Sequence, residues 1–172
     1  YRVEWLRFID TLSATESGDA RVTSIHAIAQ IFESPGGLLL MRDEGGNQFN
    51  LVATWFASGP QDRSIAGLRA TEDLPRFLED RQWVVDLREY RLKPSLYRNI
   101  ELPAWLLDES LNWRIVNPLF ELDRLVGFLV LQSPPDPFQM TFEDRDLLRT
   151  AGRHVATLLA QQAADRKLVE SR

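Results

Sequence analysis

The sequence of 172 residues contains no cysteine. Disulfides, thiolate metal sites, thiol nucleophiles and thioether-linked chromophores are therefore excluded. Long apolar runs are also missing, since those at 37–41 and 125–131 fall far short of the roughly 20 residues that span a bilayer. Basic residues are not in excess, because 20 Lys and Arg against 25 Asp and Glu give a formal net charge of -5. We therefore expect neither membrane insertion by this domain nor nucleic-acid binding.

The length and a hydrophobic content of 44% are typical of one compact domain, which we place at 1–172. Residue 1 is Tyr rather than Met, and no basic start followed by an apolar stretch comes after it. The chain is therefore interpreted as an internal domain of a longer protein, without a signal peptide.

The strongest pattern lies at 113–132, where two apolar runs flank Glu121-Leu122-Asp123-Arg124 and predict a hairpin. Strict alternation places two sets of side chains on opposite faces of the second run: Val126, Phe128 and Val130 on one, and Leu125, Leu129 and Leu131 on the other. Because both faces are apolar, the hairpin must lie at the centre of a sheet that is covered on both sides. Asp123 is expected in the left-handed turn position, unless the loop exceeds two residues, and Pro118 at a bulge or unpaired position.

The other elements follow from helical or alternating apolar spacing and from turn residues. Asp19 is expected to cap the second helix, Asp73 to cap a helix over 74–81, and Thr141 with Asp144 to form a capping box. The predicted order is a helix at 1–14, a helix at 19–33, a hairpin at 36–56, a helical and irregular pocket-covering segment at 57–112, the central hairpin at 113–132, and a long helix at 141–172 that continues as a coiled connector.

This order of elements resembles that of a GAF domain. The segment 34–43 is similar to the first strand and turn of that family, and Asn117-Pro-Leu-Phe120 followed by 124–131 resembles its "PL…R-x-x-G-x-L-x-L" core. The resemblance implies an α+β, GAF-like and PAS-related fold, with a central antiparallel sheet of five to six strands flanked by helices. It also implies N- and C-terminal helices packed together.

Five further segments, 82–87, 102–105, 117–119, 142–153 and 168–172, resemble the GAF region of the sensor histidine kinases associated with PEP-CTERM/exosortase systems. This resemblance implies a non-catalytic sensory or regulatory domain in the cytoplasm. It would lie between an N-terminal region anchored in the inner membrane and a downstream dimerisation and ATP-binding kinase core. Two alternatives stay open, a GAF input domain of a transcription regulator and a small enzyme that uses a pocket.

Residues for catalysis or metal binding do not form a pattern. His26 and His154 are the two histidines, and no metal-binding or phospho-acceptor motif accompanies either of them. No nucleophile and base can be paired, and the pairs at 36–37 and 45–46 are interpreted as turn glycines. The cyclic-nucleotide signature of some GAF domains is missing as well. We expect no catalytic residue, metal or cofactor.

Two candidate sites follow from the resemblance. GAF pockets lie between the sheet and the segment after the second strand, and here the hypothesised lining is Trp55, Phe56, Arg88, Tyr90, Tyr97, Trp105 and Trp113. Such a pocket would suit a small amphipathic acid, unless these aromatics simply fill the core. A homodimer through the terminal helices is also expected, in which one set of side chains packs against each other or against a second copy: Trp5, Phe8, Leu12, Val155, Leu158 and Leu159.

Overall fold

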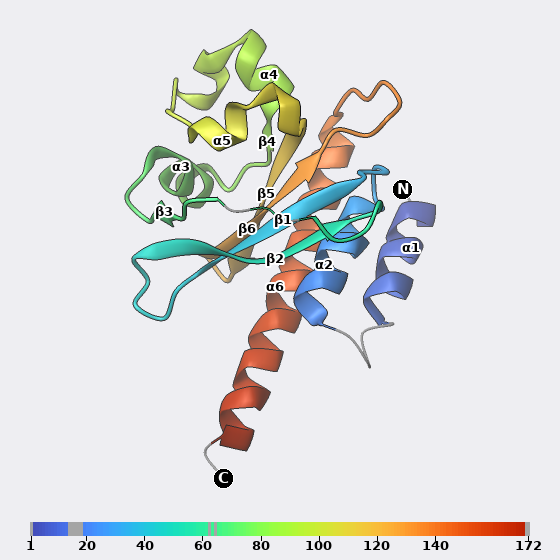
Figure 1. Ribbon diagram of the computed structural model, residues 1–172, viewed down its shortest axis with the longest axis vertical. Coiled ribbons are helices and arrows are strands. Elements are labelled where there is room, and N and C mark those ends of the chain that lie inside the picture. Colours follow the sequence, from blue (N-terminus) through green and yellow to red (C-terminus); the bar gives the residue numbers. More distant parts are fainter. Residues whose placement is uncertain (1, 14–18, 62, 64, 171–172) are drawn as a thin grey trace.

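The computed structural model describes residues 2–13, 19–61, 63 and 65–170. These residues form one six-stranded antiparallel sheet of order β3-β2-β1-β6-β5-β4, with helices on both faces (Figure 1). The predicted α+β class and sheet of five to six strands are confirmed.

The elements have the following bounds: α1 Arg2–Ser13, α2 Ala20–Ala29, β1 Gly36–Arg42, β2 Gln48–Phe56, β3 Leu68–Arg69, α3 Asp73–Arg81, β4 Val85–Asp86, α4 Leu87–Leu92, η2 Pro94–Tyr97, α5 Ala104–Leu107, η3 Glu109–Leu111, β5 Trp113–Glu121, β6 Arg124–Gln132 and α6 Phe142–Glu170. Helix α2 ends before the predicted residue 33, and β3 lies in a stretch that we predicted as loop. Residues 1, 14, 171 and 172 of the predicted terminal helices lie outside the described residues.

Each face of the sheet is buried under its own layer. Leu129 and Leu131 of β6 pack in a cluster with side chains of α1, α2 and α6, whereas Phe128 and Val130 pack in a second cluster with side chains of α3, α4, η2 and α5. All four side chains are fully buried. The central hairpin is therefore covered on both sides, as its two apolar faces require.

Register shifts in the sheet change which residues share a face. Leu119 pairs with Gly127 and Phe120 with Leu125, so Val126 is an extra residue in β6. As a result, Leu125 packs on the side of Phe128, and Val126 packs on the opposite side. The predicted alternation is wrong for these two residues. The strand β2 behaves likewise, because its pairing with β1 shifts at 51–53.

The turn of the central hairpin differs from the prediction. Glu121 pairs with Arg124, so the loop has two residues, and Leu122 rather than Asp123 takes the left-handed conformation, with φ 55°. Pro118 lies beyond the short strand β4, which pairs only with residues 115 and 116. On its other side Pro118 is in register with Phe128 of β6, so the predicted unpaired position holds only towards β4.

Side-chain caps define the starts of two helices. The Asp19 carboxylate accepts a hydrogen bond from the Arg21 N–H at 2.9 Å. The capping box is reciprocal, since the Thr141 N–H donates to Asp144 Oδ2 at 2.8 Å and the Asp144 N–H donates to Thr141 Oγ1 at 3.1 Å. The predicted cap by Asp73 is wrong, because Asp73 is the first residue of α3 and its carboxylate accepts from the Glu101 N–H at 2.8 Å.

The terminal helices α1 and α6 lie on the same side of the sheet, with α2 between them (Figure 1). The rings of Trp5 and Phe8 on α1 reach the His154 ring on α6, at centroid distances of 5.2 and 6.5 Å. The C-terminal part of α6 extends beyond the sheet, and residues 163–169 are exposed. Within the described part of the chain, no helix has the length and apolarity needed to cross a membrane.

Candidate functional site

Residues 65–112, here called the covering segment, lie over the sheet face that carries Phe128 and Val130. The segment consists of short pieces, from β3 to η3, and no piece exceeds nine residues. Pro94 and Pro103 stand at the starts of η2 and α5, where a missing N–H costs no helical hydrogen bond. A segment of this kind can present many side chains to one point above the sheet.

Tyr97 at the end of η2 is the centre of an aromatic cluster in the covering segment. It is fully buried, and its ring lies 5.5 Å from Trp83, 5.6 Å from Phe77 and 6.1 Å from Tyr90, measured between centroids. Tilted and offset rings at such distances stabilise one another beyond their burial. These four aromatic side chains fix the covering segment above the sheet.

The hydroxyl of Tyr97 lies in a buried polar network. It donates to Glu89 Oε1 at 2.7 Å and accepts from the Asp86 N–H at 3.0 Å and from Arg145 Nη2 at 3.2 Å. Because burial disfavours the phenolate, it raises the pKa of Tyr97 to about 12. The hydroxyl therefore stays protonated at neutral pH and can serve as both donor and acceptor.

Arg145 connects this network to α6. Its side chain is only 7% exposed, its Nη2 donates to Glu89 Oε1 at 2.9 Å, and its Nη1 donates to the Val84 carbonyl. The guanidinium also lies 4.7 Å from the centroid of the Trp83 ring. Arg145 is in the first turn of α6, where the helix dipole disfavours a cation. The contacts with Glu89, Val84 and Trp83 offset this unfavourable interaction with the dipole, and they join α6 to the covering segment.

A second buried ion pair lies beside the network. Arg114 Nε donates to Asp86 Oδ1 at 2.7 Å, and each side chain is 8% exposed. Arg114 Nη2 also donates to the Phe138 carbonyl at 2.9 Å, and Asp86 Oδ1 caps α4 by accepting from the Arg88 N–H at 3.1 Å. The pair therefore joins β5, the start of α4 and the loop before α6.

The structure brings together five of the seven residues of the hypothesised pocket. Phe56, Tyr97 and Trp113 are buried in the cluster beneath the covering segment, with Tyr90 and Trp105 packed against it. Trp55 lies on the opposite face of the sheet, where it stacks on His26 at 4.4 Å, and Arg88 is exposed on α4. That these residues bind a ligand stays a prediction.

Two donors in this cluster have no partner among the described residues. The indole Nε1 atoms of Trp105 and Trp113 are both buried without a hydrogen bond. Buried N–H groups are normally satisfied by protein or by water, and leaving one unmade costs about 1–3 kcal/mol. Each indole could therefore donate to an oxygen of a water or of a bound molecule.

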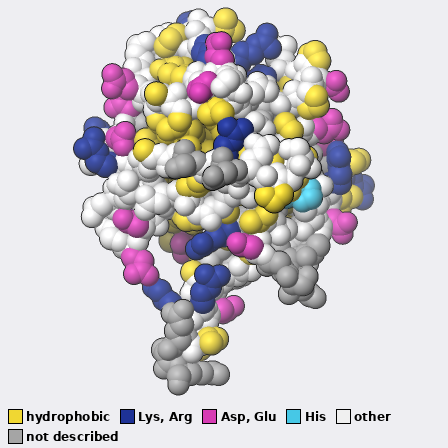
Figure 2. Space-filling model, in the orientation of Figure 1, with side chains coloured by type: hydrophobic (Ala, Val, Ile, Leu, Met, Phe, Trp, Pro, Cys, Tyr) yellow, Lys and Arg dark blue, Asp and Glu magenta, His cyan; other side chains and the backbone are white. Residues whose placement is uncertain are grey.

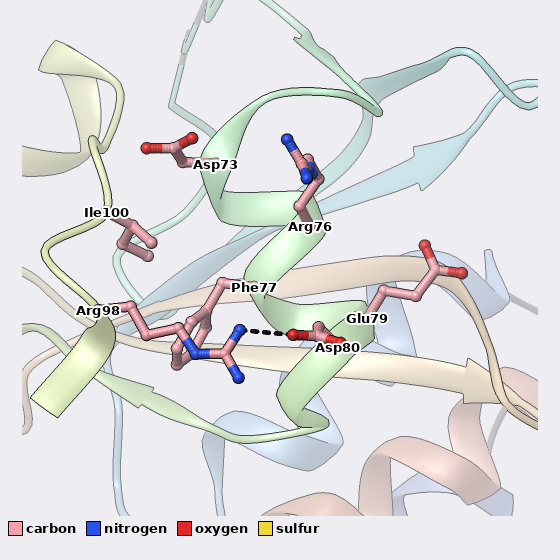
Figure 3. Close-up of a pocket in the computed structure, with 7 residues that line it drawn as sticks. All are labelled: Asp73, Arg76, Phe77, Glu79, Asp80, Arg98 and Ile100. Atoms are coloured by element: carbon pink, nitrogen blue, oxygen red, sulfur yellow. Dashed lines mark hydrogen bonds and ion pairs between the residues drawn. The ribbon is translucent and has the colours of Figure 1, made fainter.

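A hollow of about 620 Å³ runs along α3, and Phe77 is the member of the aromatic cluster that lines it (Figure 3). Arg98 from the loop after η2 points across it to Asp80 on α3, and the two form an ion pair. Phe77 and Ile100 give it an apolar part, while Asp73, Arg76 and Glu79 complete a lining of mixed charge. On the face shown in Figure 2, basic and acidic side chains are likewise interspersed.

The side chains predicted for the terminal-helix interface pack mainly within the chain. Phe8, Val155 and Leu159 are buried, while Trp5, Leu12 and Leu158 are half-buried. Leu12 and Leu158 line a hollow of about 420 Å³ between α1 and α6. These side chains thus pack against each other, and their contact with a second copy stays a prediction.

Sequence reasoning missed the buried polar residues Asp86, Arg114 and Arg145. A signal was present for the two arginines, since Arg114 interrupts an apolar strand and Arg145 occupies the unfavourable first turn of a helix. Their partners could not be found from sequence, because Asp86 is 28 residues from Arg114 and Glu89 is 56 residues from Arg145. Among the described residues, no three His, Asp or Glu side chains are grouped so that they could hold a metal ion.

Comparisons with known proteins give a match in structure. No protein-family model matches the chain, and no curated protein matches its sequence. A GAF domain from a phosphoenolpyruvate-protein phosphotransferase of Coxiella burnetii shares 16% identity and a TM-score of 0.67, covering 95% of this chain and 96% of that one. The corresponding domain from Acinetobacter shares 15% identity and a TM-score of 0.66, with the same two coverages.

A methyl-accepting chemotaxis protein, residues 122 to 287, is also similar. It shares 10% identity and a TM-score of 0.61, and the match covers 92% of this chain and 95% of that one. Identities this low establish similarity of fold, and the match spans almost the whole length of each partner. With its six-stranded antiparallel sheet between two helical layers, the chain has the fold of a GAF domain.

Proposed function

We propose that this chain is a non-catalytic sensory or regulatory domain of a membrane-associated sensor histidine kinase, acting in two-component signal transduction. The observation that carries the proposal is the arrangement of α6. Its first turn is fastened to the covering segment through Arg145, and residues 163–169 at its other end extend exposed beyond the sheet. The GAF fold and the resemblance of 142–153 to kinase-associated GAF regions agree with this role.

The helix provides a direct route for a signal. A 29-residue helix is about 43 Å long at 1.5 Å per residue, so a shift of its first turn moves its far end as a rigid body. A change in the covering segment would displace Glu89 and Tyr97, which both contact Arg145. The proposed output is a small rotation or translation of α6 that is passed to a downstream kinase core.

A small-molecule ligand is part of the proposal. The indole donors of Trp105 and Trp113 have no hydrogen-bond partner among the described residues and lie in the apolar cluster beneath the covering segment, where they would suit the oxygens of a small amphipathic acid. A thermal-shift screen of this chain against a metabolite library should find an acid that raises the melting temperature. Trp105→Phe should reduce that shift. If no compound stabilises the chain, the ligand part of the proposal is wrong.

The proposed assembly is a homodimer in a cytoplasmic region of a protein anchored in the inner membrane. Helices α1 and α6 of two copies would form a parallel bundle in line with the kinase helix. Light scattering of this chain should then show a mass that increases with concentration towards twice 19.8 kDa. A constant monomer mass at high concentration would contradict the dimer.

The kinase context can be tested on the full-length protein. Its coding sequence should continue beyond Arg172 into a dimerisation and ATP-binding core, and the protein should transfer phosphate from ATP to a histidine outside residues 1–172. Arg145→Met should alter the rate of that transfer without removing the core. A DNA-binding domain downstream would instead support an input domain of a transcription regulator, and turnover by residues 1–172 alone would support a small enzyme.

A further inference from the structure

A separate cavity of about 300 Å³ opens at the β4 edge of the sheet. It lies between α4 and the loop before α6, and Arg88, Lys93, Arg114 and Gln139 contribute to its lining. The aromatic residues of the cluster around Tyr97 are not among its lining residues. It is therefore distinct from the space beneath the covering segment.

The two carboxylates in the cavity wall are already engaged. Asp86 is paired with Arg114 at 2.7 Å, and Glu89 accepts from Arg145 at 2.9 Å. These two acidic and two basic groups cancel in formal charge. The side chains of Arg88 and Lys93 are exposed and form no ion pair within the part of the chain that the structure describes. Arg145 is not part of the lining, so the wall itself has three basic and two acidic side chains and a formal surplus of one positive charge.

Arg114 adds a fixed donor to this positive wall. Its Nε and Nη2 atoms are occupied by Asp86 and by the Phe138 carbonyl, and its guanidinium lies 5.4 Å from the centroid of the Phe138 ring. Its Nη1 atom makes no hydrogen bond to any described residue, and the side chain lines the cavity. The guanidinium is thus held in place with one donor nitrogen left for a bound group.

We propose that this cavity binds a small organic dianion, whose carboxylate or phosphate oxygens are held by Arg88, Lys93 and Arg114. The volume is at the lower end of the range for ligand cavities, which limits the occupant to a small molecule. Leu92 and Met140 in the lining provide an apolar wall for its carbon skeleton. Because the cavity lies between α4 and the loop leading to α6, the bound molecule would contact both the covering segment and the residues just before α6.

The test uses this chain with inorganic phosphate and succinate as probes, titrated calorimetrically at constant ionic strength. We expect saturable binding of at least one probe. Arg88→Gln combined with Lys93→Gln should weaken that binding at least tenfold. A control with the same change in charge, Arg166→Gln combined with Lys167→Gln on the exposed part of α6, should bind like the unmodified chain.

A second measurement locates the probe. In a nitrogen-proton NMR spectrum, the Arg114 side-chain Nε–H signal should shift on saturation, because that guanidinium contacts the bound anion. The proposal is overturned if neither probe binds saturably, if both double variants lose binding equally, or if the Arg114 signal does not move. These outcomes do not depend on whether the full-length protein is a kinase, so this proposal and the proposed function can fail separately.

Discussion

Replacing Arg114 by Met tests whether the buried pair with Asp86 determines the stability of this edge of the fold. Each side chain is 8% exposed, so Arg114→Met leaves a carboxylate with almost no access to water. Removing one partner of a buried ion pair typically costs about 3–5 kcal/mol. Asp86 keeps its hydrogen bond from the Arg88 N–H, so we expect a loss near 3 kcal/mol in the free energy of unfolding.

Two companion variants provide the reference values. Combining Arg114→Met with Asp86→Asn removes both charges while the Asn oxygen can still accept from the Arg88 N–H, and this double variant should recover most of the loss. Arg98→Gln breaks the pair with Asp80, whose side chains are 51% and 63% exposed, and it should cost less than about 1 kcal/mol. The two pairs thus contain the same residue types and differ in burial.

The assay is equilibrium unfolding in urea, followed by tryptophan fluorescence and far-UV circular dichroism. The free energy of unfolding and the slope with urea should be determined for all three variants and the unmodified chain. If Arg114→Met costs no more than Arg98→Gln, the carboxylate of Asp86 is not confined as the structure shows. If the double variant is as unstable as Arg114→Met, the unpaired charge is not the cause of the loss.

Three further predictions concern single positions. Tyr97→Phe should lower the free energy of unfolding in urea by about 1–3 kcal/mol, because the hydroxyl forms hydrogen bonds with buried groups. In the unmodified chain, the stability that depends on the raised pKa of Tyr97 should be fully present below pH 10 and be lost as the pH rises through about 12. Ultraviolet titration of the phenol can follow this change. Gly152→Val should lower stability by about 1–3 kcal/mol, since a Cβ there would lie 2.8 Å from the Pro118 carbonyl oxygen, and an unchanged melting temperature would contradict that close approach of α6. Leu122→Gly should instead raise the melting temperature, because Leu122 is 88% exposed and has a positive φ that glycine adopts without strain; a lower melting temperature would contradict this.

Much of the fold could be predicted because its signals are local. The apolar runs at 113–120 and 125–131 imply a strand pair buried on both faces whatever surrounds it, and Asp19 and Thr141 mark helix starts through contacts with residues two or three positions away. Turn and cap residues act through neighbouring backbone groups, and side-chain periodicity reports which faces are buried. These effects need no knowledge of distant segments.

The tertiary structure alone decided the bulges, the small strands and the polar network. Val126 changes sides because β5 and β6 shift register, and β3 exists as a strand because two residues meet the edge of β2. Arg145 receives Glu89 and Tyr97 only after the covering segment has folded over the sheet.

The sequence by itself therefore determined the order of the main helices and hairpins, the doubly covered hairpin and the helix caps at Asp19 and Thr141. Only the folded chain decided which aromatic residues meet and which charges are buried together. It also decided how the first turn of α6 contacts the covering segment. The physical reason is separation along the chain: local hydrogen bonding and periodicity involve neighbouring residues, whereas the pairs of Asp86 with Arg114 and Glu89 with Arg145 join residues that are 28 and 56 positions apart.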